Sequence, residues 1–294
     1  MKHILITGAT GNVGREVIRY LSKYRNDCKV SAGVRNIAKA RQSLNDFNDL
    51  DFRTFDFEDE LTYEQAFQSI DSLFLLRPPH ISKVDRVFRP MMEMAVKQGV
   101  KEIVFLSVQG AEKSSIIPHN KIEKLIRESG PDYVFLRPSY FMQNLTTTLH
   151  DDIKNKRQII LPAGKAKFNW IDVKNIGEAA AIVLKNFKKY RNKAFDLTGY
   201  ENKSFGELCD LINQHIPGNI EYRSVNPLHF YLIKRKSGMP AGMILVMIML
   251  HFLPRFQSEP EISGFFEKLS GKKPTCLEVF ILREKSRFMP PATL

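Results

Sequence analysis

The sequence predicts an α/β protein built on a doubly wound parallel sheet, with a smaller C-terminal substrate or lid region. The first half of the chain alternates short β-rich runs with helical stretches, which is typical of successive βαβ units. Several of these runs are continuously apolar, as expected for strands that helices cover on both faces of a sheet. The 294 residues, 43% of them hydrophobic, suffice for one large α/β unit with a smaller appendage.

Six strands are predicted in the first half, with helices between them. The first helix is expected directly after the first strand, where Val17, Ile18 and Leu21 give an amphipathic run, and two later helices end at Gly99 and Gly130. The predicted strands are residues 3–7, 29–34, 50–55, 72–76, 102–107 and 133–137, and the clearest helices are 13–23, 63–69, 89–98 and 120–129.

The regular alternation loosens after residue 137. Residues 158–161 and 194–197 are predicted as short strands, and residues 175–185 and 205–215 as helices. We therefore predict a smaller region in the second half of the chain.

The strongest apolar run of the chain covers residues 243–253. It is much shorter than the roughly 20 residues that a membrane-spanning helix needs, it contains His251, and it stops at Pro254. This favours a buried or lid helix over membrane contact. We expect residues 1–150 to form the cofactor domain and residues 151–294 to form the substrate or lid region, interleaved with the first.

The beginning of the chain and its cysteines favour a cytoplasmic protein. Met1 and its two successors lead directly into an apolar run, without the pattern of a secretory signal. The three cysteines, Cys28, Cys209 and Cys276, lack the spacing of a disulfide framework or a zinc site. We expect reduced thiols and no metal.

The net charge of +12 is concentrated in one segment. Residues 153–193 hold eleven Lys and Arg against Asp172 and Glu178, which gives +9 over 41 residues. A solvated basic face is favoured over a nucleic-acid surface, because aromatic residues are not interleaved with the lysines and no DNA- or RNA-binding motif occurs. Nucleic acid is therefore an unlikely partner.

A glycine-rich turn separates the first strand from the first helix. In a Rossmann domain such a turn bends tightly at its first glycine, brings backbone N–H groups to a pyrophosphate at the second, and lets helix and strand pack closely at the third. The helix N-terminus then stabilises the negative charge. The spacing G-x-x-G-x-x-G differs from the usual G-x-G-x-x-G. The expected cofactor contacts are Gly8, Thr10, Gly11, Asn12, Val13 and Gly14.

Arg35 follows the second strand, where an acidic residue would bind the 2′-hydroxyl of NAD and repel the 2′-phosphate of NADP. A guanidinium at this point can instead make bidentate, charge-assisted bonds to that phosphate. The alternative is an exposed loop cation. We predict NADP(H) rather than NAD(H) as the cofactor.

Two further pairs of residues follow predicted strands. Asp56 and Phe57 follow the third strand, where they could meet the adenine edge, although an aspartate that caps its own turn is nearly as good an interpretation. Leu76 and Arg77 follow the fourth strand, at the edge where parallel sheets bind ligands. We count all four as candidate cofactor contacts.

Six short motifs, taken together, link the sequence to a known family. They are residues 7–14 (TGATGNVG), 34–36 (VRN), 106–107 (LS), 119–123 (HNKIE), 136–144 (LRPSYFMQN) and 171–173 (IDV). On these motifs, over most of its length, the chain resembles the NmrA-like branch of the atypical short-chain dehydrogenase/reductases. The resemblance implies a Rossmann fold and NADP(H). The family includes NADPH-dependent quinone and azo-dye reductases, other reductases, and NADP(H)-sensing regulators without turnover.

The chain departs from ordinary short-chain reductases at the catalytic Tyr-x-x-x-Lys pair. Ser115 stands at the tyrosine position and His119 at the lysine position, while Ser107 occupies the family's serine position. Because a serine cannot replace a tyrosine as proton donor near neutral pH, the departure argues against a nucleoside-diphosphate-sugar epimerase. Reduction of a quinone is less demanding, since it needs mainly orientation and a dry pocket.

The candidate catalytic residues are His119, Tyr140 and Ser107. His119 could donate a proton near pH 7, or be a surface residue at a helix start, with Lys121 reaching the nicotinamide ribose instead. By the family pattern, Tyr140 lies against nicotinamide and substrate. Asp172 is interpreted as structural.

These observations predict an NADPH-dependent oxidoreductase that transfers hydride to a small, flat, electron-poor acceptor such as a quinone, under a lid formed by residues 228–256. The alternative is a non-catalytic NADP(H) sensor that acts through a protein partner. A homodimer is left open, and no membrane span is expected.

Overall fold

The computed structural model describes residues 1–24, 27–115 and 117–290. By its internal contacts the chain divides into two units, each made of three separate segments. Unit 1 comprises Met1–Pro138, Val173–Leu197 and Phe265–Lys273, and unit 2 comprises Ser139–Asp172, Thr198–Gly264 and Pro274–Leu294. The predicted roles of residues 1–150 in cofactor binding and of residues 151–294 in substrate binding stay predictions.

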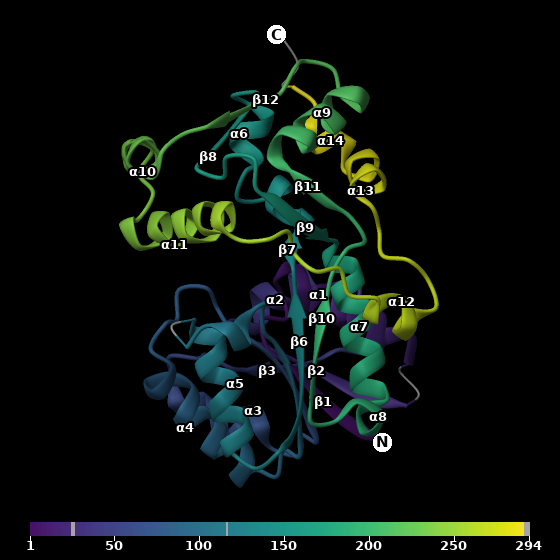
Figure 1. Cartoon of the computed structure of the whole chain (residues 1–294). Helices are drawn as coiled ribbons and strands as arrows, with labels where there is room; N and C mark the ends of the chain where they lie inside the picture. Colours follow the sequence, from purple (N-terminus) through teal and green to yellow (C-terminus); the bar gives the residue numbers. More distant parts are fainter. Residues whose placement is uncertain (25–26, 116, 291–294) are drawn as a thin grey trace. The chain divides into compact units, whose positions relative to one another are not determined.

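Unit 1 is built on a parallel sheet that has seven strands in the described part of the chain (Figure 1). The strands are ordered β10-β6-β5-β4-β1-β2-β3, so the chain runs outward from β1 in one direction and from β4 in the other. This confirms the doubly wound Rossmann sheet. The strands are β1 (Lys2–Ile6), β2 (Cys28–Val34), β3 (Asp51–Thr54), β4 (Ser72–Leu76), β5 (Glu102–Leu106), β6 (Asp132–Pro138) and β10 (Lys193–Leu197).

Helices cover both faces of this sheet, as its buried apolar strands require (Figure 1). α3, α4 and α5 pack beside one another, and α1 packs along α7. A Cβ atom on Gly177 would lie 2.5 Å from the Cβ atom of Glu16, so glycine is what lets α7 approach α1 this closely. The helices are α1 (Asn12–Leu21), α2 (Ile37–Ser43), α3 (Tyr63–Phe67), α4 (Val84–Lys97), α5 (Pro118–Glu128), α7 (Val173–Lys185), α8 (Phe187–Tyr190) and α12 (Phe265–Ser270).

Several predicted elements differ from the structure in extent or place. The helix predicted at 175–185 is α7, which lies in unit 1 rather than in a smaller region. α4 begins at Val84, five residues before its predicted start, and accommodates Pro90 in its interior. The strand predicted at 194–197 is β10, which pairs with β6 of the large sheet rather than belonging to a smaller region. Periodicity identifies a strand but not its partner, because β10 and β6 are distant in sequence.

Unit 2 contains two small sheets, one with the order β11-β9-β7 and one that pairs β12 with β8. Ser204 begins α9 with a capping box, in which its hydroxyl accepts from the Glu207 amide and the Glu207 carboxylate accepts from the Ser204 amide. The elements are β7 (Tyr140–Phe141), β8 (Gln158–Leu161), β9 (Lys167–Ile171), β11 (Asn202–Ser204), β12 (Glu221–Ser224), α6 (His150–Lys154), α9 (Phe205–His215), α10 (Pro227–Lys236), α11 (Ala241–Phe252), α13 (Leu277–Arg283) and α14 (Lys285–Phe288).

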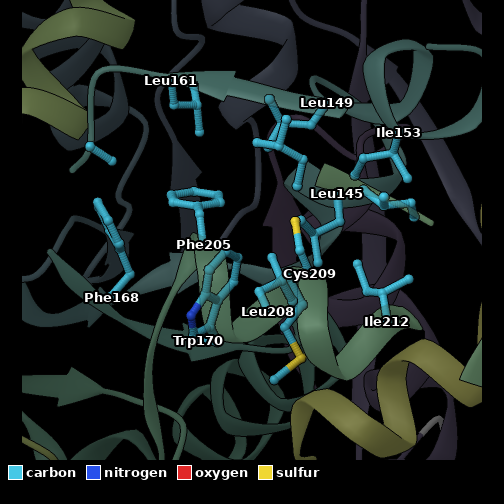
Figure 2. Packing of buried hydrophobic residues seen from close by; sticks show 14 of the residues in the cluster. Leu145, Leu149, Ile153, Leu161, Phe168, Trp170, Phe205, Leu208, Cys209 and Ile212 are labelled. Atoms are coloured by element: carbon cyan, nitrogen blue, oxygen red, sulfur yellow. The ribbon is translucent and has the colours of Figure 1, made fainter. Parts of the chain in front are cut away.

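The core of unit 2 is aromatic where β9 meets α9 (Figure 2). Trp170 and Phe205 are fully buried, with ring centroids 5.3 Å apart, and Phe168 packs edge-on against Phe205 at 5.1 Å. Buried aromatic pairs of this geometry add to the stabilisation that comes from burial alone. The core therefore gives unit 2 a rigid centre around Tyr140, which packs against all three rings.

The basic segment 153–193 is divided between the two units. Several of its cations are already bound: Lys156 pairs with Asp152, Lys185 pairs with Asp27, and the Arg157 guanidinium donates to backbone carbonyls. Other cations of the segment, such as Lys165, Lys188 and Lys189, are exposed, and the solvated basic face stays a prediction.

Neither a membrane span nor a metal cluster occurs within the described ranges. No helix there is both long and apolar enough to cross a bilayer. No group of three or more His, Cys, Asp or Glu side chains is placed to hold a metal ion. The apolar run at 243–253 forms most of α11, which has only twelve residues.

Candidate functional site

The glycine turn after β1 has the geometry that the sequence predicts. Gly8 is left-handed, with φ of 61°, and its carbonyl accepts a hydrogen bond of 2.9 Å from the Gly11 amide. A Cβ atom on Gly14 would lie 2.3 Å from the Gly8 carbonyl oxygen and 2.8 Å from the Cα atom of Ala9. Only glycine fits at position 14 without moving the backbone.

The turn leaves the N-terminus of α1 open to an anion. Gly11 is the N-cap, and no side chain caps the helix. The first amides of a helix have no partner within it, so those of Asn12, Val13 and Gly14 can bind a phosphate at the positive end of the helix dipole. Thr10, Gly11 and Asn12 are exposed. The residues present therefore fit the pyrophosphate of a dinucleotide.

Thr7 fastens this turn to the neighbouring strand β4. Its hydroxyl donates to the Phe74 carbonyl at 3.1 Å and accepts from the Leu76 amide at 2.9 Å. A Cβ atom on Gly8 would meet the Leu76 side chain at 3.2 Å. Leu76 thus packs directly against the turn, whereas Thr7 itself was not among the predicted site residues.

Arg35 lies one residue beyond the end of β2, which pairs in parallel with β1. The carboxyl ends of the two strands therefore lie at the same edge of the sheet as the glycine turn. Arg35 is exposed, and no ion pair of its guanidinium occurs in the described part of the chain. This is the state of a cation that is available to an anionic ligand.

Asp56 and Phe57 are engaged in local structure. The Asp56 carboxylate accepts from the Glu58 amide at 3.1 Å, which is the turn-capping arrangement considered above as the alternative. Phe57 is buried against Phe55, with ring centroids 4.8 Å apart. A cavity of about 320 Å³ borders Phe57 and Ile81 beyond the ends of β3 and β4. The predicted adenine contact at these residues stays a prediction.

Arg77 and His119 contact each other beyond the ends of β4 and β5. The Arg77 Nε–H donates to His119 Nε2 at 3.4 Å, and its Nη1 donates to the carbonyls of Pro78 and Ile81. Burial, with a further contribution from Arg77, lowers the pKa of His119 to about 3. The imidazole is therefore neutral at pH 7, stacked on Phe105, and cannot serve there as an imidazolium donor. Lys121, on α5, is exposed.

Ser107 belongs to a buried ionic network. Its hydroxyl donates to a Glu123 carboxylate oxygen at 2.6 Å, and Arg137 binds both oxygens of that carboxylate at 2.9 and 2.7 Å. Glu123 is 1% exposed. The Ser107 proton thus points at Glu123 in this structure. Sequence reasoning missed Glu123, although its place in the HNKIE motif on the buried face of α5 was a usable signal.

Tyr140 lies in the aromatic core of unit 2 and pairs with His251 of α11. The Tyr140 hydroxyl and His251 Nε2 are 3.0 Å apart, and His251 Nδ1 donates to the Met247 carbonyl at 2.7 Å. Burial lowers the pKa of His251 to about 4, so the ring is neutral at pH 7. Since Nδ1 carries the proton, Nε2 accepts from the Tyr140 hydroxyl. Burial also raises the pKa of Tyr140, although a hydrogen bond with Asn144 opposes this.

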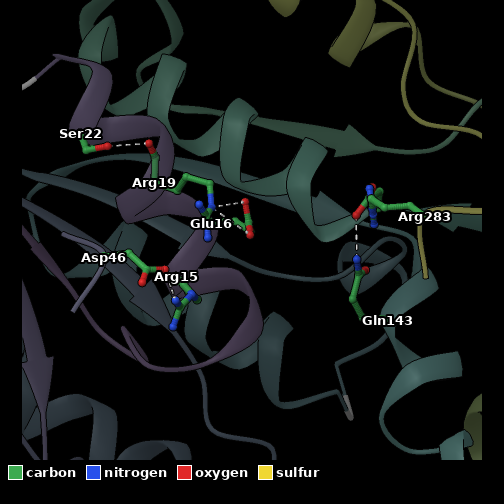
Figure 3. A network of polar contacts seen from close by, with 8 residues as sticks. Arg15, Glu16, Arg19, Ser22, Asp46, Gln143 and Arg283 are labelled. Atoms are coloured by element: carbon green, nitrogen blue, oxygen red, sulfur yellow. Dashed lines mark hydrogen bonds and ion pairs between the residues drawn. The ribbon is translucent and has the colours of Figure 1, made fainter. Parts of the chain in front are cut away.

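Asp172 has the surroundings of a structural residue. It is fully buried, and its carboxylate accepts from Gln143 Nε2 at 2.7 Å and from Arg283 Nη1 at 2.6 Å. Figure 3 labels Gln143 and Arg283. These bonds join the start of unit 2, its last segment and the end of β9. The ion pair therefore ties together three stretches of chain that are far apart in sequence.

The pattern of the NmrA-like family matches residues 1–277. The chain belongs to this family. Prestalk A differentiation protein A of Dictyostelium discoideum is 30% identical over 227 residues, which cover 77% of this chain and 74% of that protein. Quinone oxidoreductase 2 of Escherichia coli (strain K12) is 26% identical over 243 residues, which cover 82% of this chain and 84% of that protein.

The fold of this NmrA-like chain also occurs in a solved structure of an NADPH-dependent quinone oxidoreductase from Escherichia coli, complexed with NADPH. The two superpose with a TM-score of 0.82 at 24% identity, and the match covers 95% of this chain and 99% of the other. This similarity confirms the Rossmann fold, and the family match over residues 1–277 confirms the resemblance drawn from the motifs.

Proposed function

We propose that the protein is an NADPH-dependent oxidoreductase that reduces a small, flat, electron-poor acceptor of the quinone type. The glycine turn carries this proposal, because it leaves the amides at the start of α1 open beside the exposed guanidinium of Arg35. A family relative named quinone oxidoreductase supports the class of acceptor.

In this proposal, unit 1 holds the cofactor. The amides of residues 12–14 bind the pyrophosphate, Arg35 binds the 2′-phosphate, and Leu76 packs against the turn that positions both. Asp56, Phe57, Arg77 and Lys121 remain candidate contacts to the rest of the dinucleotide. When bound, NADPH supplies a hydride.

The proton chemistry of the chain favours an acceptor that needs little acid catalysis. His119 is neutral at pH 7, the Ser107 hydroxyl donates to Glu123, and the Tyr140 hydroxyl donates to His251. A quinone accepts a hydride to give a stabilised phenolate, which takes its proton from water without a strong acid beside it. The acceptor is bound by unit 2, with residues 228–256 as the lid, and Tyr140 orients it.

The test is NADPH consumption by the purified protein with a panel of quinones, with NADH in parallel. Saturable turnover that prefers NADPH is expected. His119→Ala and Tyr140→Phe are compared with the unchanged protein. Since general acid catalysis contributes about 100-fold or more, a loss of that size in His119→Ala would identify a proton donor, whereas a small change agrees with a proton taken from water.

A non-catalytic NADP(H) sensor is the second candidate. It is favoured by the same engagement of Ser107 and by the absence of the Tyr-x-x-x-Lys pair from the sequence. Tight NADPH binding without reduction of any acceptor in the panel would replace the enzyme proposal with this one, and a search for a protein partner would follow.

A further inference from the structure

One face of α11 is apolar and exposed. Ile244, Met247 and His251 face the core of unit 2 and are buried. On the opposite side of the helix, Leu245 is 57% exposed and Leu250 is 50% exposed. The other exposed apolar residues of this face are Met243, Val246 and Met249, and the exposed Leu253 follows the helix directly. The helix is therefore apolar around its whole circumference, although only one side of it is buried.

Neighbouring segments enlarge this surface. α10 packs against α11 and contributes Leu228 and Leu232, and the turn after α11 contributes Phe256, which is 74% exposed. We call these exposed apolar residues of α10, α11 and the following turn the α10–α11 surface. Exposed apolar groups of this extent usually mark a binding surface.

The charged side chains within the segment that carries the α10–α11 surface are all cations. Residues 222–258 contain five Lys and Arg but no Asp or Glu. Lys234 is buried in an ion pair with Asp152, whereas Arg235, Lys236 and Arg255 are exposed. An apolar helix face flanked by exposed cations is complementary to the interface of an anionic bilayer.

We propose that the α10–α11 surface binds the interface of an anionic membrane, with α11 lying in the plane of the bilayer. α11 has twelve residues, which is too short to span, but it presents a continuous apolar face to the acyl chains while the flanking cations meet lipid phosphates. A second copy of the chain fits less well, because a two-fold axis would bring like charges together. The inference does not rest on the proposed function, although this surface lies on the segment that is proposed there as the lid.

The test is co-sedimentation of the full chain with phosphatidylcholine vesicles and with vesicles that also contain phosphatidylglycerol. We expect binding to the anionic vesicles, weakened by salt. Leu245→Glu with Leu250→Glu, and separately Arg235→Glu with Lys236→Glu, should each lower the partition coefficient by about tenfold or more. The control is Leu61→Glu in unit 1, which puts the same charge on a leucine that is 92% exposed and should bind as the unchanged chain does.

The α11 substitutions are on exposed positions, so circular dichroism should show an unchanged fold. Binding that both double variants retain would overturn the proposal, as would equal binding to neutral vesicles. A chain that ignores vesicles but forms a dimer that Leu245→Glu dissociates would identify a second copy as the occupant and also overturn it.

Discussion

Polar groups are exposed at the carboxyl edge of the unit 1 sheet, whereas those in the aromatic core of unit 2 are paired with each other. At the edge, no side chain caps the amides at the start of α1, and the guanidinium of Arg35 is exposed, as our proposal of a bound dinucleotide requires. In unit 2, the hydroxyl of Tyr140 and the ring of His251 satisfy each other inside the protein. The difference separates groups that are arranged for binding from groups whose first role is to hold the fold.

The Ser107–Glu123–Arg137 network is the exception within unit 1. It lies at the end of β5, but its polar groups bond one another inside the protein. Replacing Glu123 by Ala leaves the Arg137 guanidinium buried without its bidentate partner. We expect a loss of about 3 kcal/mol or more in the free energy of unfolding, measured by urea denaturation. Glu128→Ala, on the exposed side of α5, is the control and should change stability little. Equal effects of the two variants would contradict the structural role of the network.

The glycine turn should respond in ligand affinity more than in stability. Gly14→Ala places a methyl group against the Gly8 carbonyl, so α1 and the turn must move apart. We expect NADPH affinity to fall about 100-fold or more, since an overpacked backbone contact costs about 1 to 3 kcal/mol and the phosphate amides are displaced as well. Fluorescence titration with NADPH measures it. Gly242→Ala, where a Cβ atom meets nothing within 4 Å, should bind normally.

The buried Tyr140–His251 pair in unit 2 predicts a pH dependence of stability. His251 has a pKa of about 4 when folded and an ordinary value near 6.5 when unfolded, so between these values the unfolded chain binds more protons. Stability from this residue is then fully present above pH 6.5 and falls as the pH drops toward 4, by up to about 3 kcal/mol. Urea midpoints from pH 7 to 4 should show this slope, reduced in His251→Gln. His80→Gln, at an exposed histidine, is the control for the substitution itself.

Much of unit 1 could be predicted from the sequence because its signals are local. Apolar runs predicted β1 to β6, and the spacing of Gly8, Gly11 and Gly14 predicted the turn, although Leu76 of the distant strand β4 also packs against it. The place of β10 in the large sheet could not be predicted, because strand partners that are far apart in sequence leave no periodic signal.

The candidate site shows the same difference between features that depend on nearby residues and features that depend on distant ones. The openness of the turn and of Arg35 follows from residues close in sequence, whereas three engaged side chains depend on distant partners. Tyr140 meets His251, Ser107 meets Glu123 and Asp172 meets Arg283, each pair joined only by tertiary packing. His119 in the HNKIE motif was considered as a proton donor near pH 7 or as a surface residue. Burial beside Arg77 lowers its pKa and makes the imidazole neutral, and no sequence pattern indicates that contact.

The substitution with the smallest expected effect tests the proposed role of Arg35 most specifically. Arg35→Glu replaces an attraction for the 2′-phosphate by a repulsion, so NADPH affinity should fall about tenfold or more while NADH affinity changes little. Parallel titrations with both cofactors measure the ratio, and Lys97→Glu, which reverses an exposed charge on α4, should leave it unchanged. Equal losses for both cofactors would show that Arg35 acts on the turn as a whole. A change confined to NADPH would mean that an exposed side chain, with no role in holding the fold, selects the cofactor.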